Sequence, residues 1–201
     1  MDQAAAGSFT AFSGHHRLAS GRLAEVALAV KIASAGEAPP PIVIFDDSTG
    51  RSIDLDLRGS HREIVARLTP PAEPPEVDAV AQPRGRGRPK LGVVAREVTL
   101  LPRHWEWLGA QPGGASVALR KLVEEARRVN ADRDRARAAR DAAYHFMSVM
   151  AGNLAGFEEA TRALFAADRT KFDTLIAAWP DDIRNHIIKL AFGDRSEPTS
   201  L

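Results

Sequence analysis

The most distinctive spacing in this sequence is a short basic segment. Arg84, Arg86, Arg88 and Lys90 are separated only by glycine and proline, and no acidic residue lies between them. Glycine allows close backbone approach to another surface, proline keeps the chain extended, and arginine is attracted to the strongly negative, narrow minor groove of A·T-rich DNA. We therefore predict that residues 83–90 contact DNA, with Gly87 as the point of closest backbone approach.

A solvated linker is the alternative interpretation of this segment, because a run of like charges often only faces water. In that case the protein would be a non-enzymatic interaction or adaptor protein, with the basic segment as a hinge. Sensitivity of DNA affinity to salt separates the two hypotheses, because phosphate contacts release counterions.

Other chemically useful side chains lack the spacing that catalysis or metal binding needs. None of the six histidines pairs at i,i+4 with a third ligand, and no phosphate loop or nucleophile elbow is present. The absence of cysteine excludes thiolate zinc sites, cysteine nucleophiles and disulfides. His15 and His16 could in principle bind a metal with Asp46 and Asp47, but we interpret the pairs as a loop and a hairpin turn. The sequence predicts no enzyme, no metal and no cofactor.

Overall composition gives no further argument for nucleic acid. The 201 residues include 27 Lys and Arg against 26 Asp and Glu, a formal net charge of +1. No apolar run approaches the roughly 20 residues of a membrane span, and the N-terminus lacks the basic start of a signal peptide. We expect a cytoplasmic protein without a membrane partner.

Proline-rich sequence divides the chain and predicts an α+β fold. Six prolines lie between positions 70 and 89, so residues 69–92 are predicted to be a semi-stiff linker that carries the basic arm. The other predicted regions are an α+β module (1–68), a strand-helix-helix (93–130), a helical region (131–193) and a flexible tail (194–201).

Apolar periodicity predicts the elements within these regions. Residues 1–68 are expected to form, in order, a strand (8–12), a helix (20–34), a hairpin of two strands (41–45 and 52–58) and a helix (60–68) with Ser60 and Glu63 as a capping box. A strand (97–101), a helix (102–111), a long helix (about 115–150) and three shorter helices (157–167, 170–178 and 180–192) follow. On the predicted helix at 102–111, Trp105 and Leu108 are expected in the core and Trp107 nearer the surface.

The segment from Arg96 to Val123 resembles the ribbon-helix-helix fold, because its strand ends at Leu101-Pro102 and a Gly-x-Ser turn precedes the second helix. The preceding Arg86-Gly87-Arg88-Pro89 resembles an AT-hook. The first resemblance implies a homodimer whose paired strands enter the major groove, with phosphate held at Gly114, Ala115 and Ser116. One register turns Arg96, Val98 and Leu100 outward and the other turns Glu97, Thr99 and Leu101 outward, and both stay open. The DNA-contacting residues are thus predicted to be Arg84, Arg86, Gly87, Arg88, Lys90, Arg96, Thr99, Gly114 and Ser116.

Nearly the whole chain also resembles an uncharacterised bacterial family, domain of unknown function 2239. The resemblance rests on Ile42–Asp47, Gly87–Val94, Arg96–Arg127, Phe146–Ser148 and Gly156–Ala160. This family resemblance implies no particular activity. The functional hypothesis therefore rests on the basic arm and the ribbon-helix-helix resemblance: a bacterial transcriptional regulator that binds DNA, with A·T-rich sequence as the favoured target.

Overall fold

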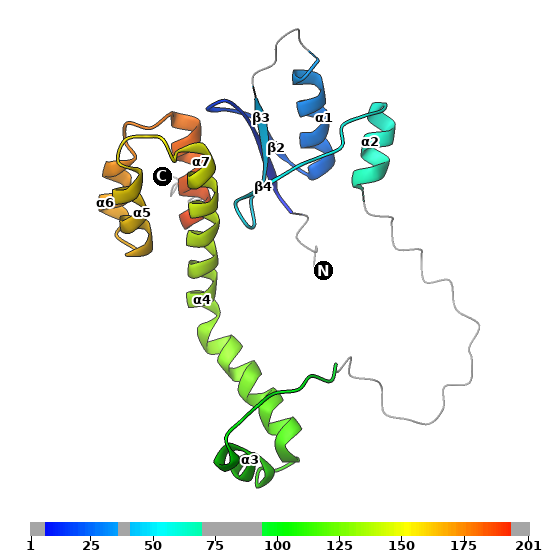
Figure 1. The fold of residues 1–201 in the computed structure, drawn as a ribbon, viewed down its shortest axis with the longest axis vertical. Coiled ribbons are helices and arrows are strands. Elements are labelled where there is room, and N and C mark those ends of the chain that lie inside the picture. Colours follow the sequence, from blue (N-terminus) through cyan, green and yellow to red (C-terminus); the bar gives the residue numbers. More distant parts are fainter. Residues whose placement is uncertain (1–6, 36–40, 70–93, 194–201) are drawn as a thin grey trace, which may run out of the picture. The chain divides into compact units, whose positions relative to one another are not determined.

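Two compact units make up the chain. A computed structural model describes residues 7–35, 41–69 and 94–193 (Figure 1). One unit, here called the sheet unit, combines residues 1–70 with 132–201, and the other, the helical unit, is residues 71–131. The described parts contain seven helices and one four-stranded antiparallel sheet, which confirms the α+β prediction. In these same parts, no helix combines the length and apolar character needed to cross a membrane.

The sheet has the strand order β2-β1-β3-β4. Its strands are β1 (Phe9–Ser13), β2 (His16–Gly21), β3 (Ile42–Asp46) and β4 (Arg51–Ile53). The predicted strand at 8–12 and the hairpin after residue 41 are confirmed, although the last strand is shorter than expected. The polar strand β2 was not predicted, because its sequence HRLASG lacks the alternation that marks a half-buried strand.

Alternate residues of the two central strands face two separate cores. Ala11 and Ile44 pack with Val26 and Val30 of α1 (Leu23–Ala33), which lies along one face of the sheet (Figure 1). Phe12 and Phe45 point the other way, because successive side chains of a strand alternate between faces. The helix that the sequence placed at 20–34 begins only at Leu23, because residues 16–21 belong to β2.

The second face of the sheet is covered by the C-terminal helices. Phe146, near the end of α4 (Gly114–Met150), packs against Phe12 and Phe45 with ring centroids 5.1 and 4.7 Å apart. The same core includes residues of α5 (Phe157–Phe165), α6 (Arg169–Leu175) and α7 (Asp181–Phe192). Their order confirms the helices expected after residue 156.

This packing changes the division of the chain that the proline-rich segment suggested. The sequence placed residues 1–68 in a module of their own, whereas Phe12 and Phe45 share one buried core with residues 143–191. Proline-rich composition shows where regular structure is interrupted. It does not show which distant helix packs against the sheet. A truncation that starts near residue 80 would therefore strip that core of two buried phenylalanines.

A short helix, α2 (His61–Leu68), closes the N-terminal part. Its predicted capping box is present, since Ser60 Oγ accepts a hydrogen bond from Glu63 N and Glu63 Oε2 accepts one from Ser60 N at 2.6 Å. The hydrogen bonds from Ser60 to the Glu63 carboxylate lower the pKa of that side chain.

The helical unit consists of α3 (Pro102–Gly109) and the first part of α4. Both helices were predicted, with Pro102 at the first turn of α3 and the glycines at 113 and 114 between them. No strand is assigned at residues 97–101 in the single chain, where 94–101 form no regular structure. A lone strand has no ladder partner, so the predicted strand is absent from this chain and the ribbon-helix-helix resemblance has no support here.

Candidate functional site

The predicted DNA contacts separate into two groups. Those of the basic arm, namely Arg84, Arg86, Gly87, Arg88 and Lys90, lie outside the described residues. Arg96, Thr99, Gly114 and Ser116 all belong to the helical unit. Arg96, Thr99 and Ser116 are exposed, and Gly114 is half-buried.

Gly114 begins α4 with a φ of +73°, directly after Gly113 at +88°. The N–H of Gly114 donates to the carbonyl of Gln111 at 2.9 Å, so it is already engaged within the turn. The next N–H groups of the first turn lack partners within their own helix by geometry alone. A phosphate at this end of α4 would therefore meet Ser116 and its neighbours rather than Gly114.

Apolar side chains are unusually exposed in the helical unit. Among its described residues, the buried apolar side chains are Leu108 and Ala118. Trp105 is 41% exposed and Trp107 is 53% exposed, so Trp105 does not join Leu108 in the core as the sequence suggested. The other large exposed side chains of this unit are Val94, Val98, Leu101, Leu122, Val123 and Val129.

A hollow of about 270 Å³ lies within this apolar surface. It is lined by Leu100, which precedes α3, and by residues of α3 and α4, namely His104, Trp107, Leu108, Leu119 and Leu122. Large contiguous apolar surface commonly marks a contact with another molecule. The described residues of the helical unit, 94–131, therefore leave much of their apolar surface uncovered.

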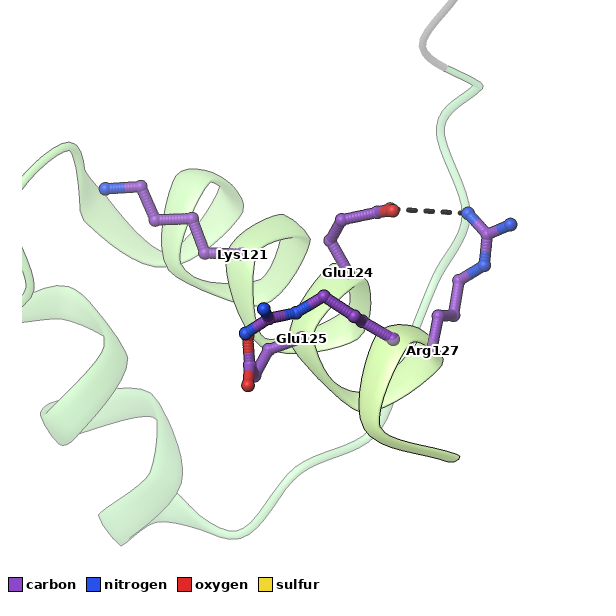
Figure 2. A pocket seen from close by; sticks show the side chains of 5 residues that line it. Lys121, Glu124, Glu125 and Arg127 are labelled. Atoms are coloured by element: carbon purple, nitrogen blue, oxygen red, sulfur yellow. Dashed lines mark hydrogen bonds and ion pairs between the residues drawn. The ribbon is translucent and has the colours of Figure 1, made fainter. Parts of the chain in front are cut away.

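Charged side chains occupy a different part of α4 (Figure 2). A shallow surface hollow of about 630 Å³ is lined by Lys121, Glu124, Glu125, Arg127 and Arg128. Figure 2 shows Arg127 reaching Glu124, 3.3 Å away, and Arg128 pairs with Glu125 at 2.6 Å. Both arginines thus have an acid three residues earlier on the same helix, which reduces their attraction for phosphate.

The same pattern continues along α4 into the sheet unit. Arg135 pairs with Asp132, and Arg137 pairs with Asp134 at 3.1 Å. An arginine-rich helical stretch of this kind is either a solvated face with local ion pairs or a surface that contacts DNA or another helix. These four pairs match the first interpretation.

Three arginines of the helical unit, unlike the paired arginines of α4, have no acidic partner among the described residues. Arg96, Arg103 and Arg120 are exposed, and none forms an ion pair with another residue that the structure describes. They are the available cations nearest in sequence to the basic arm and to the first turn of α4.

The sheet unit holds a buried polar cluster that sequence reasoning missed. The Asp47 carboxylate accepts hydrogen bonds from Ser8 and Thr10 at 2.9 and 3.1 Å, and Lys189 Nζ lies 3.3 Å away. His186 Nε2 lies 3.4 Å from Asp47 Oδ1, and both ring nitrogens lack a hydrogen-bond partner. No sequence signal links Asp47 with residues some 140 positions later, because only the fold brings them together.

Burial governs the charge of His186. Its side chain is 1% exposed between the rings of Phe12 and Phe146. Burial lowers its pKa to about 4, the Asp47 carboxylate opposes that shift, and the cations Lys189 and Arg17 support it. His186 is thus neutral at pH 7, and the cluster links the turn that follows β3 to α7.

We expect acid to destabilise the sheet unit through His186. Its folded pKa lies below the unfolded value of about 6.5, so the unfolded state binds more protons between those pH values and stability falls as pH falls. Urea denaturation at pH 7 and pH 5 should show a loss of about 1–2 kcal/mol in unfolding free energy. In a His186→Phe variant that loss should shrink; an unchanged pH dependence would show that His186 is not its source.

Comparison with known proteins gives one match. A family model described as "Uncharacterized protein conserved in bacteria (DUF2239)" matches residues 8–191. The match runs from the start of the sheet to α7, so both units and the basic arm fall within it. No curated protein and no solved structure matches the chain.

Proposed function

Because this chain belongs to that uncharacterised bacterial family, whose description assigns no activity, we propose a function from its own residues: a homodimeric DNA-binding protein that regulates transcription. The observation that carries the proposal is the basic arm, in which Arg84, Arg86, Arg88 and Lys90 have no acidic neighbour between them. Phosphate contacts by such cations supply most of the affinity in non-specific DNA binding.

Charges on the helical unit support this proposal. Arg96, Arg103 and Arg120 are exposed without ion pairs among the described residues, so they are available to phosphate at little cost. The first turn of α4 adds backbone donors beside Ser116, and helix N-termini favour anions. Contacts with bases by Arg96 in one strand register, or by Thr99 in the other, belong to the same proposal.

Exposed apolar surface on the helical unit supports the homodimer. A second copy would cover Trp107, Leu122 and their neighbours, and it would bring a second basic arm to the same duplex. Two arms double the number of cations that reach the DNA, which steepens the salt dependence of binding.

The direct experiment is fluorescence anisotropy of the full chain on two labelled duplexes, one A·T-rich and one G·C-rich, in low and moderate salt. We expect binding to both duplexes, weakened by salt, with the A·T-rich duplex bound more tightly because its minor groove is narrower and more negative. No measurable binding at low salt would reject the proposal and favour an adaptor with a basic hinge.

We expect Leu122→Gln to weaken self-association. Leu122 is 48% exposed and lines the apolar hollow, so an amide there would be buried without a partner in the dimer, at about 1–3 kcal/mol per subunit. Light scattering at micromolar concentration should give a dimer for wild type and a shift toward monomer for the variant. Arg120→Gln, an exposed neighbour on the same helix, is the matched control and should stay dimeric; a monomeric wild type would exclude the homodimer.

A further inference from the structure

A cavity in the described part of the sheet unit lies beside α1 and α2. Its volume is about 680 Å³, and it is lined by residues from the start of β1, from α1 and from α2. Cavities of 300–1,000 Å³ are the usual size for small-molecule sites. We call it the α1–α2 cavity.

Most of its wall is apolar. Phe9 of β1, Leu23 and Leu28 of α1, and Val65 and Leu68 of α2 supply side chains that are only partly buried. α2 spans eight residues and fully buries a single one, Ile64, so the described chain covers Val65 and Leu68 only in part. Because α2 packs mainly through Ile64, a space remains beside Val65 and Leu68.

Two charged residues also line the cavity. They are Arg22 and Glu25, at the start of α1. Glu25 Oε2 accepts a hydrogen bond from the backbone N–H of Arg22 at 3.1 Å, so this carboxylate is already engaged with the positive end of the helix. The Arg22 guanidinium is exposed and forms no ion pair with any residue within 7–35, 41–69 or 94–193.

We propose that the α1–α2 cavity binds a small molecule with an apolar body and one carboxylate, such as a medium-chain fatty acid. The apolar body lies against Leu28, Val65 and Leu68, and the carboxylate meets the guanidinium of Arg22. This pairing matches the lining of the cavity, which combines apolar side chains with one exposed arginine, Arg22, that forms no ion pair among the described residues. The proposal does not depend on DNA binding.

The test uses three probes on the full chain: octanoate, its neutral counterpart 1-octanol, and acetate, which has the charge without the apolar body. Two-dimensional NMR titration should show saturable binding of octanoate, weaker binding of octanol and none of acetate. The shifted signals should include those of Phe9, Leu28 and Val65. Absence of octanoate binding, or shifts confined to other residues, would overturn the proposal.

Two variants separate the contributions of charge and volume. Arg22→Gln keeps the backbone donor that caps α1 but removes the charge, so octanoate should bind about tenfold more weakly and approach octanol in affinity. Ala24→Leu places extra methyl groups in the cavity and should weaken both probes. Equal binding of octanoate and octanol by wild type would overturn the assignment of a carboxylate ligand. If Ala24→Leu loses helicity, the shifts mapped on wild type decide the site.

Discussion

Replacing Gly50 with alanine is expected to unfold the sheet unit or to destabilise it by at least about 4 kcal/mol, an effect seen only when a specific structural feature is broken. Gly50 ends the turn between β3 and β4 with a φ of +64°, which side chains other than glycine rarely adopt. An added Cβ would lie 1.8 Å from the carbonyl oxygen of Ala142, in the backbone of α4. Neither backbone can move without separating the sheet from its helical cover.

Gly14 provides a matched control for this prediction. It lies in the turn between β1 and β2 with a φ of +56°, and an added Cβ would meet nothing within 4 Å. Gly14→Ala should therefore cost only the backbone strain, about 1–2 kcal/mol. Urea denaturation followed by circular dichroism compares the two variants. Equal losses would show that the contact between the turn and α4 does not carry the effect.

Local patterns predicted most of the individual elements. Alternation in residues 8–12 marked β1, and the short apolar run in residues 41–45 marked β3. The capping residues Ser60 and Glu63 marked the start of α2. Edge strand β2 was not predicted, because most of its residues are exposed. Such a strand needs no alternation of apolar and polar residues.

Long-range packing could not be predicted in the same way. The core that joins Phe12 and Phe45 to Phe146 depends on contacts between residues more than a hundred positions apart, and such contacts leave no periodic signal. The polar cluster at Asp47 and His186 has the same origin. Trp105 was expected in a core because tryptophan is usually buried, yet among residues 94–131 only Leu108 and Ala118 are buried apolar side chains, and these residues leave Trp105 exposed.

The basic arm of the candidate DNA-binding site could be recognised from the sequence because its signal is local: four cations within seven residues, with no acid between them. Arginine count alone would have pointed equally to α4. The structure separates the two, because Arg127, Arg128, Arg135 and Arg137 each have an acid three residues earlier. No acid interrupts the arm.

Removing the charges of the arm is expected to change DNA binding more than any other substitution of surface charge. The variant replaces Arg84, Arg86, Arg88 and Lys90 with alanine. Each phosphate contact steepens the fall of log K with log salt by about 0.9 units. A dimer carries two arms, so if half of their cations engage phosphate, the slope should flatten by roughly 3 to 4 units.

Two further variants define what the arm does. Gly87→Val leaves the charge unchanged but blocks close backbone approach, so it should abolish a preference for A·T-rich DNA and retain much of the salt slope. Replacing Arg127, Arg128, Arg135 and Arg137 with alanine removes the same number of cations from α4. Because those cations are already paired, this control should change the slope much less than the arm variant.

The salt dependence of binding to one A·T-rich duplex, compared between the wild-type chain and the variant with four alanines in the arm, tests the proposed function most directly. We expect a steep, linear fall of log K with log salt for wild type and a slope flatter by roughly 3 to 4 units for the variant. Equal affinity and equal slope for the two proteins would contradict the proposal and leave the basic arm as a linker.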